Sequence, residues 1–242
     1  MNARSSWMTA TLGALLATAS AGAQDLEGRF TLAIEAGTDT EIAGDVLESA
    51  SGTLIGLPVT IDRRSYRDAY RPEIRGQVLL GYGVAADREL VAKGTYYKVD
   101  NEGIAAGQAA DADLFAFLSE YEEWGVEVAY RFYLASRTRL KSYLGPVAGV
   151  RLTHSMLVTF AVPEEGSSIS NIPLYEASTV GVFGADIGFS FDLGENAYVG
   201  LETGLRYQTK PTQQNAVAGF ETIDDDGGRW SAPVVLMLGV RF

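Results

Sequence analysis

The chain has a single histidine, His154, and Ser155 follows it directly. These residue types act as general base and nucleophile in hydrolysis when they lie within hydrogen-bonding reach. Neighbouring side chains of an extended strand point to opposite faces, so the pair cannot share a proton within one strand. A hydroxyl from another strand can still approach His154, but no motif points to one, and no residues have the spacing of metal ligands. The sequence therefore predicts no catalytic site, no metal and no cofactor.

The charged residues form a much more regular pattern. Eight segments alternate between polar and apolar residues, as half-buried strands do, and within each segment all charges share one face. The segments are 28–36, 73–84, 89–97, 123–134, 140–152, 174–191, 197–207 and 230–242. This regularity predicts eight β-strands, each with a charged face and an apolar face.

The charges on these faces balance, with eight of each sign. The basic residues are Arg29, Arg75, Lys93, Arg131, Lys141, Arg151, Arg206 and Arg241, and the acidic ones are Glu35, Glu73, Glu89, Glu123, Glu127, Glu176, Asp186 and Glu202. A buried charge is tolerated only when it is paired. We therefore expect a closed, plugged interior crossed by an ion-pair network of Glu35, Arg75, Lys93, Glu127, Arg131, Arg151, Glu176, Asp186, Glu202 and Arg206.

Alternation alone does not say which face lies inside. A soluble lipocalin-type barrel has apolar residues inside and charges outside, whereas a membrane barrel is the reverse. Aromatic residues of the apolar face gather at the strand ends, which is typical of the two membrane interfaces. One rim would hold Phe30, Tyr82, Phe132, Phe191 and Phe242, and the other Tyr96, Trp124, Tyr175, Tyr207 and Trp230. Together with the neutral polar face, this favours the membrane barrel.

The N-terminal segment indicates export. Arg4 precedes an apolar run from Trp7 to about Ala19, and Ala21-Gly22-Ala23 resembles a cleavage site, so residues 1–23 are predicted to be a signal peptide and 24–242 one β-domain. The chain has no Cys, so no disulfide can form. Its net charge of −12 argues against nucleic acid as a partner.

The connections also alternate in length. Short links at 85–88, 135–138 and 192–196 follow the second, fourth and sixth segments, and long excursions follow the first, third, fifth and seventh. Short periplasmic turns and long outer loops are typical of outer-membrane barrels. The predicted fold is an all-β, eight-stranded, antiparallel, up-and-down transmembrane barrel with a polar, charge-paired interior, located in the outer membrane of a Gram-negative cell.

With its signal peptide, its eight alternating segments and its terminal pattern of Leu236, Leu238, Val240 and Phe242, the chain resembles the OmpA/OmpX/OmpW-like group of small outer-membrane barrels. The resemblance covers essentially the whole of residues 24–242. It implies that Phe242 is an assembly signal read by the barrel-assembly machinery. It also implies outer-membrane lipid and lipopolysaccharide as surroundings.

The long excursions leave several alternatives open. In the first, residues 63–71 carry four Arg that can bind lipopolysaccharide phosphates or pair with Asp62 and Asp68, and 53–61 can add an irregular strand. In the second, 111–121 has the spacing of a short interfacial helix but can equally begin an elongated fourth strand. Acidic residues 224–226 can bind a divalent cation loosely or form a solvated loop.

The alternation of the fifth segment continues into the third excursion, through Met156, Val158, Phe160 and Val162. This pattern predicts a hairpin that projects beyond the membrane. Exposed strand edges of such a hairpin can pair with a strand of another protein or only with their own neighbours. The function indicated is a non-enzymatic, structural or surface-interaction role of the adhesion kind, with an extracellular protein partner. The alternatives are an OmpW-like channel for small solutes and, on the resemblance, a barrel enzyme that modifies lipid A.

Overall fold

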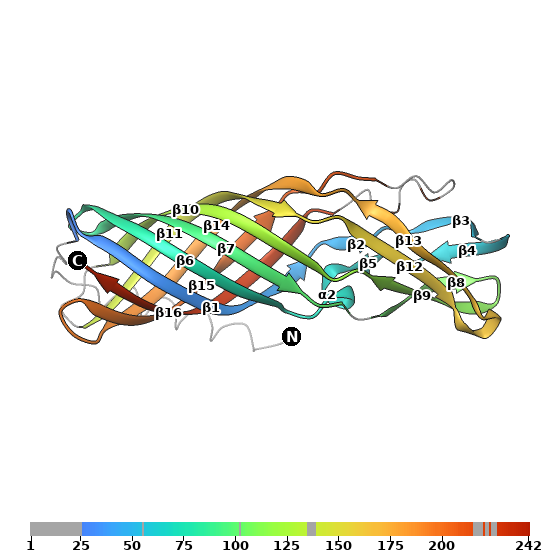
Figure 1. The fold of residues 1–242 in the computed structure, drawn as a ribbon, viewed down its shortest axis with the longest axis horizontal. Coiled ribbons are helices and arrows are strands. Elements are labelled where there is room, and N and C mark those ends of the chain that lie inside the picture. The colour runs from blue at the N-terminus through green and yellow to red at the C-terminus, as the bar shows by residue number, and fades with distance from the viewer. Residues whose placement is uncertain are drawn as a thin grey trace, which may run out of the picture.

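The computed structural model describes residues 26–54, 56–101, 103–134, 139–214, 220, 223 and 227–242. The predicted signal peptide, the link at 135–138 and the acidic residues 224–226 lie outside this part of the chain, and those expectations stay predictions. Figure 1 shows an elongated molecule, with a barrel at one end and a β-sheet extension at the other.

Eight strands pair antiparallel with their sequence neighbours, and the last pairs with the first to close the barrel. All eight predicted strands are present. The first strand is longer than expected, and the sixth begins four residues later. The barrel strands are β1 (Phe30–Ala43), β6 (Glu73–Ala85), β7 (Arg88–Val99), β10 (Tyr121–Leu134), β11 (Leu140–Thr153), β14 (Ser178–Asp192), β15 (Ala197–Gln208) and β16 (Arg229–Arg241).

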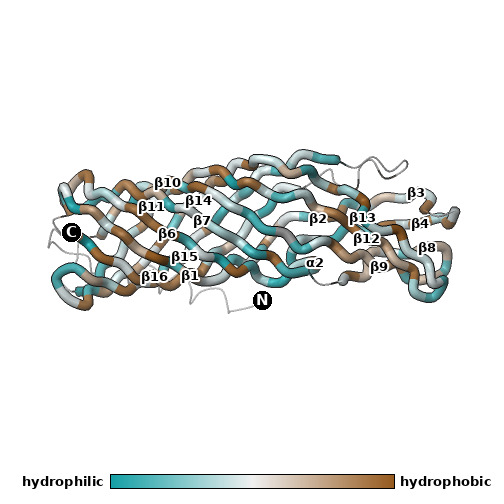
Figure 2. Tube along the Cα trace, viewed as in Figure 1, coloured by the Kyte–Doolittle hydropathy of each residue, from teal (hydrophilic) through white to brown (hydrophobic). Residues whose placement is uncertain are grey.

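The polarity of the barrel is that of a membrane protein. Apolar side chains such as Leu32, Val126 and Leu236 are 45–65% exposed on the outer face, whereas the charged side chains of the opposite face are buried. Figure 2 shows the resulting alternation of hydrophilic and hydrophobic residues along the strands. An apolar outer surface belongs in lipid, so the barrel is a transmembrane barrel of the outer-membrane type, and the lipocalin-type alternative is wrong.

Aromatic rings cluster at both ends of the outer face. At one rim Phe30 lies 5.0 Å from Tyr82, and at the other Tyr96 lies 4.5 Å from Trp124, both measured between ring centroids. Such belts mark the membrane interfaces. The prediction for Tyr175 is wrong, because its side chain is fully buried outside the barrel.

The long connections form the extension, which we define as every described element outside the barrel. Its larger sheet has six strands in the order β13-β12-β9-β8-β4-β3, and β2 pairs separately with β5. The elements are β2 (Asp45–Leu47), β3 (Ala50–Leu54), β4 (Leu57–Ile61), β5 (Arg64–Ser65), α2 (Tyr66–Ala69), β8 (Ile104–Ala109), β9 (Ala112–Leu118), β12 (Met156–Val162), η1 (Pro163–Glu165) and β13 (Ser167–Tyr175).

This extension resolves two of the open alternatives and confirms one prediction. Residues 112–118 form β9 and Tyr121 begins β10, so the segment 111–121 contains strand rather than helix, and residues 53–54 and 57–61 belong to β3 and β4. The predicted projecting hairpin is present as β12 and β13. Among the described residues, neither α2 nor η1 has the length or apolar character needed to traverse a bilayer.

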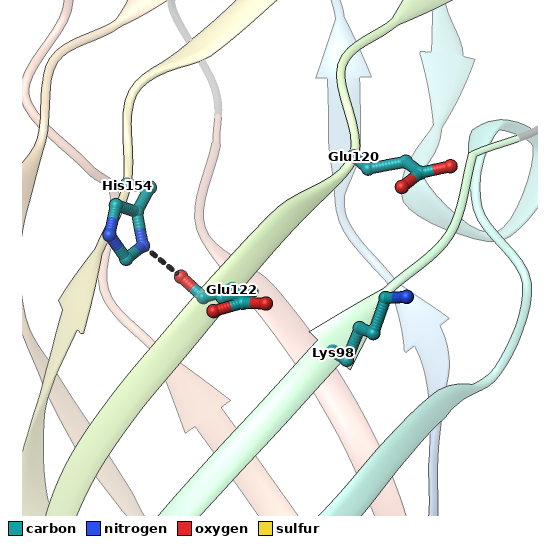
Figure 3. Close-up of a pocket in the computed structure, with 4 residues that line it drawn as sticks. All are labelled: Lys98, Glu120, Glu122 and His154. Carbon is teal, nitrogen blue, oxygen red and sulfur yellow. Dashed lines mark hydrogen bonds between the residues drawn. The ribbon is translucent and has the colours of Figure 1, made fainter.

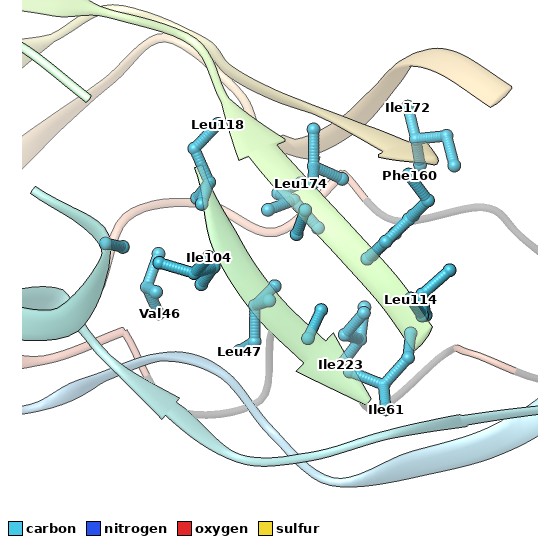
Figure 4. Close-up of a cluster of buried hydrophobic side chains, with 14 of the residues drawn as sticks. Val46, Leu47, Ile61, Ile104, Leu114, Leu118, Phe160, Ile172, Leu174 and Ile223 are labelled. Carbon is cyan, nitrogen blue, oxygen red and sulfur yellow. The ribbon is translucent and has the colours of Figure 1, made fainter. Parts of the chain in front are cut away.

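The extension has an apolar core of its own. Its strands surround a cluster of buried side chains that includes Leu47, Leu118, Phe160 and Leu174, and Phe220 and Ile223 from the last connection complete it (Figure 4). Burial of this cluster from water stabilises the extension independently of the barrel interior.

Where two of the strands leave the barrel, the side chains of one face change from facing lipid to facing the inside of the extension. In β11 the even-numbered Leu152 faces lipid, whereas in β12 the even-numbered Met156 is buried in the extension core. Two residues without strand structure, 154–155, separate β11 from β12, and residues 119–120 separate β9 from β10 in the same way. Each break turns one apolar face from the lipid to the inside of the extension.

The seam between the first and last strands ends in a reciprocal pair of backbone bonds. Phe30 N donates to Phe242 O at 2.8 Å, Phe242 N donates to Phe30 O at 2.9 Å, and the two rings stack 6.2 Å apart. Phe242 therefore adds both hydrogen bonds and an exposed aromatic ring to the closure.

A chain that lacks Phe242 should assemble poorly, because it loses both seam bonds and the ring at the membrane interface. Phe242→Leu is the matched control, since it keeps the backbone bonds and an apolar side chain. The measurement is the folded fraction in outer membranes, read from the mobility shift of unheated protein on gels. Equal folded fractions for both variants would contradict this role.

Candidate functional site

The space enclosed by the barrel, the lumen, is filled with charged side chains. Sixteen of them, nine acidic and seven basic, are at most 7% exposed among the described residues. They are Glu35, Asp39, Glu41, Glu73, Glu89, Glu123, Glu127, Asp186 and Glu202, with Arg75, Lys93, Arg131, Arg151, Arg206, Arg229 and Arg241. A water-filled passage would leave such side chains accessible to solvent, so the described lumen is closed.

The ion pairs form one continuous chain along the lumen. From the outer end, the contacts run from Arg229 through Glu123, Arg151, Glu127, Arg206, Asp186, Lys93, Glu202 and Arg131 to Glu89. Glu127 is a centre of this chain, because Arg75, Arg151 and Arg206 lie 3.2–3.5 Å from its carboxylate oxygens. Each charge thus has an opposite charge as a neighbour, which offsets part of its desolvation.

Tyrosines fill the spaces between the charges. Tyr143 donates to Glu202 at 2.7 Å, and the Arg131 guanidinium lies 4.3 Å from the centre of the Tyr143 ring. Gly188 makes room for this ring, because a Cβ at that position would overlap it. The lumen therefore combines hydrogen bonds, ion pairs and cation–π contacts, which hold its side chains in one arrangement.

Nine of the ten residues predicted for the network lie in the lumen, and Glu176 does not. Its prediction is wrong, because the ladder breaks at residues 176–177 between β13 and β14 and leaves the side chain exposed. The backbone N of Glu176 donates instead to Thr212 O. Arg29 and Lys141, which were expected on the same face, are half-buried at the rim, and Lys141 pairs there with Asp192.

Sequence reasoning missed Asp39, Glu41 and Arg229. All three continue the charged face of a predicted strand, but the expected strand bounds stopped at residue 36 and began at residue 230. The sequence does indicate Asp39 and Glu41, since both stand at odd-numbered positions, as Glu35 does, and so lie on the same face of the strand. With these three residues added, and with Glu176, Arg29 and Lys141 outside the buried set, the lumen holds nine acids and seven bases in place of the expected eight of each.

Arg229 holds together the outer end of the lumen. Its guanidinium lies 3.1 Å from Glu41, 3.2 Å from Glu73 and 2.9 Å from Glu123. It also lies 5.1 Å from the ring of Tyr66 in α2. One cation therefore pairs with three carboxylates and connects the barrel interior to the extension.

His154 lies outside the lumen, at the break between β11 and β12. Its Nδ1 is 2.6 Å from the backbone oxygen of Glu122, and the side chain borders an open hollow of about 340 Å³ with Lys98, Glu120 and Glu122 (Figure 3). The described hydrogen bond of His154 involves no hydroxyl, although Ser178 and Thr179 line a second hollow that it borders. No group of three or more metal-ligating residues occurs among the described residues.

The basic residues of the first connection pair largely with acids of the same connection. Arg63 lies 2.7 Å from Glu48, and Arg64 lies 3.1 Å from Asp62. Asp68 instead completes the capping box of α2, in which Ser65 is the N-cap and donates to the Asp68 carboxylate. Arg67 is exposed, so this connection keeps a basic group at its surface.

No protein-family model matches the chain, and no curated protein sequence matches it. Among solved structures it is similar to OprG of Pseudomonas aeruginosa (14% identity, 89% of this chain and 96% of that one, TM-score 0.48). It is also similar to Neisserial surface protein A (15%, 89% and 100%, 0.44) and to Ail of Yersinia pestis (12%, 89% and 99%, 0.41). Similarity at this level concerns the fold alone, and the fold assignment rests on the strand pairing and burial described above.

Replacement of Arg229 by Met should destabilise the protein by about 3–5 kcal/mol, because three buried carboxylates lose their shared cation. Arg63→Met is the matched control, since Arg63 is 61% exposed and a surface pair contributes at most about 1 kcal/mol. Urea unfolding in detergent micelles, followed by tryptophan fluorescence, measures both. Similar losses for the two variants would show that the buried network does not carry this stability.

Proposed function

We propose that this protein is a non-enzymatic outer-membrane barrel whose function is to present the extension for surface interaction of the adhesion kind. The observation that carries the proposal is the extension itself, a six-stranded sheet with its own apolar core beyond the aromatic rim. Mobile loops would lose conformational entropy on binding, whereas a preformed sheet does not. In this proposal the barrel is the anchor and the extension is the binding platform.

A channel function receives less support from the lumen. Transport of small apolar solutes requires an apolar passage, and the lumen is instead crossed by the continuous ion-pair chain. Opening a path would separate charges that lie within 4 Å of each other, at a cost of several kcal/mol for each unpaired ion.

Modification of lipid A also receives little support. His154 faces the outer rim of the membrane, but its described hydrogen bond is to a backbone oxygen rather than to a serine or threonine hydroxyl. A hydrolase needs the base and the nucleophile within reach of each other.

The partners of this function are proposed as well. Outer-membrane lipid surrounds the apolar face, and the exposed Arg67 is a candidate contact for lipopolysaccharide phosphates. The barrel-assembly machinery would read Phe242, and an extracellular protein would bind the extension.

Purified protein in planar bilayers should show no steady conductance, because the lumen side chains are buried and mutually paired. A general porin reconstituted in parallel provides the positive control. A reproducible open state with a defined unit conductance would favour the channel instead.

Bacteria that express the protein should adhere to cultured epithelial cells more than bacteria that carry a trimmed variant. In that variant short turns replace the three sheet hairpins, residues 50–61, 104–118 and 156–175, while the barrel strands stay intact. The gel mobility shift verifies that both proteins are folded, and antibody labelling verifies equal amounts. Equal adherence at equal surface levels would refute the proposed function.

A further inference from the structure

Two open hollows meet at His154 on the outside of the barrel. The first is the hollow of about 340 Å³ described above. The second has about 450 Å³, and its lining includes Trp124, Leu152 and Thr179. Pockets that bind small ligands commonly have about 300–1,000 Å³, so each hollow has room for a ligand group. We call the two hollows together the rim site.

The rim site exists because neighbouring strands break at the same level. The β10–β11 ladder ends at the pair of Glu123 and Thr153, and the β11–β14 ladder ends at the pair of Thr153 and Ser178. Beyond these pairs, residues 154–155 and 176–177 have no strand structure. The outer surface of the barrel wall is therefore interrupted between the barrel and the extension.

His154 is held in one orientation at this interruption. Its Nδ1 lies 2.6 Å from the backbone oxygen of Glu122 (Figure 3). A backbone oxygen can only accept, so Nδ1 carries the hydrogen, and Nε2 of the neutral ring is left as an acceptor. The side chain is exposed, so Nε2 can accept from a hydroxyl of a ligand in the rim site.

The rim site extends across the membrane interface. Trp124 and Leu152 lie opposite each other on the lipid face and are 54% and 58% exposed. The Trp124 ring also belongs to the outer aromatic belt, beside Tyr96. His154 lies beyond them, where the extension begins. A ligand that fills the whole site therefore has apolar chains and a polar head group, as a lipid of the outer leaflet does.

The charges of the first hollow disfavour phosphate. Glu120 and Glu122 border it together with Lys98, and the Lys98 ammonium already lies 3.7 Å from the Asp100 carboxylate. Three carboxylates thus surround one ammonium group. An anionic head group would be repelled, whereas a head group that donates hydrogen bonds finds acceptors.

The second hollow offers the contacts that a sugar ring needs. Its described lining contains no Lys, Arg, Asp or Glu, and it combines the Trp124 ring with the hydroxyl of the exposed Thr179. The face of an indole ring is negative, so it attracts the C–H groups on the flat side of a sugar. The hydroxyls at the edge of the same sugar can reach polar groups.

We propose that the rim site binds a glycolipid of the surrounding outer leaflet through an uncharged sugar ring. The ring packs on Trp124, its hydroxyls bond to His154 Nε2 and Thr179, and the acyl chains lie along Leu152. The bound lipid fills the interruption between the barrel and the extension. This site is separate from the proposed surface-binding function, and either can fail without the other.

Trp124 itself reports on the occupant. The chain has three tryptophans, Trp7, Trp124 and Trp230, and Trp7 belongs to the predicted signal peptide. Mature Trp230→Phe protein therefore contains Trp124 alone. It is placed in nanodiscs of phosphatidylcholine with brominated acyl chains, which quench a tryptophan that they touch. A second lipid without bromine replaces part of this lipid, and its binding at the rim site relieves the quenching.

Monoglucosyl-diacylglycerol should be preferred over phosphatidylcholine at Trp124 by about fivefold, as one added hydrogen bond gives. Phosphatidylglycerol should show no preference. Mature Trp124→Phe protein is the matched control, because Trp230 lies in the same belt beside Tyr207, on a strand that does not adjoin β11. At Trp230 the glucosyl lipid should show no preference either.

His154→Ala and Thr179→Val, each combined with Trp230→Phe, should reduce the preference for the glucosyl lipid toward one. Both side chains are exposed, and the gel mobility shift verifies that the variants fold. Glu120→Gln combined with Glu122→Gln should instead admit phosphatidylglycerol, because these variants keep acceptors and remove the negative charges.

Two results would overturn the inference. Equal preference at Trp124 and Trp230, or a preference that His154→Ala leaves unchanged, would mean that only ordinary surrounding lipid occupies the hollows. A preference of the unmodified rim site for phosphatidylglycerol would mean that it recognises phosphate and not a sugar. Adherence that depends on the hairpins of the extension would stand in either case.

Discussion

Lipid outside the barrel forces the charged residues into the lumen, and there every charge needs a counter-charge. The buried chain from Arg229 to Glu89 meets this constraint along the whole barrel. Removal of any one member leaves its partner as a desolvated ion, so the side chains are fixed as a group rather than singly. The closed lumen and the rigid base under the extension both follow from this pairing.

Outside the membrane the constraint is reversed. Water surrounds the extension, so apolar residues pack inside and the polar face turns outward. The breaks at residues 119–120 and 154–155 make this reversal without a change in the alternation of the sequence. His154 therefore marks the boundary between a polar and an apolar interior.

The barrel could be predicted because the charged residues of each strand stand only at odd or only at even positions, and this pattern determines which face is inside. A strand buried on one face cannot shift by one residue without moving all its charges into lipid. The extension could be predicted only in part, since Met156 and Val158 alternate in the same way whether their face meets lipid or a core. Glu176 was misplaced for a related reason. An odd or even position indicates the face of a side chain only within an unbroken strand, and the alternation of the sequence does not show the break at residues 176–177.

The two edge strands of the extension differ in how they are protected from pairing with other chains. Edge strands usually carry Lys, Pro or bulges that discourage pairing with other chains. β13 has such features, with Pro173 and the left-handed Asn171 (φ 60°), whereas β3 has neither a basic residue nor a proline. β3 is only five residues long, which limits pairing with other chains, and its exposed Ser51 and Thr53 carry small polar side chains. The extension therefore protects one edge strand by its sequence and the other by its short length.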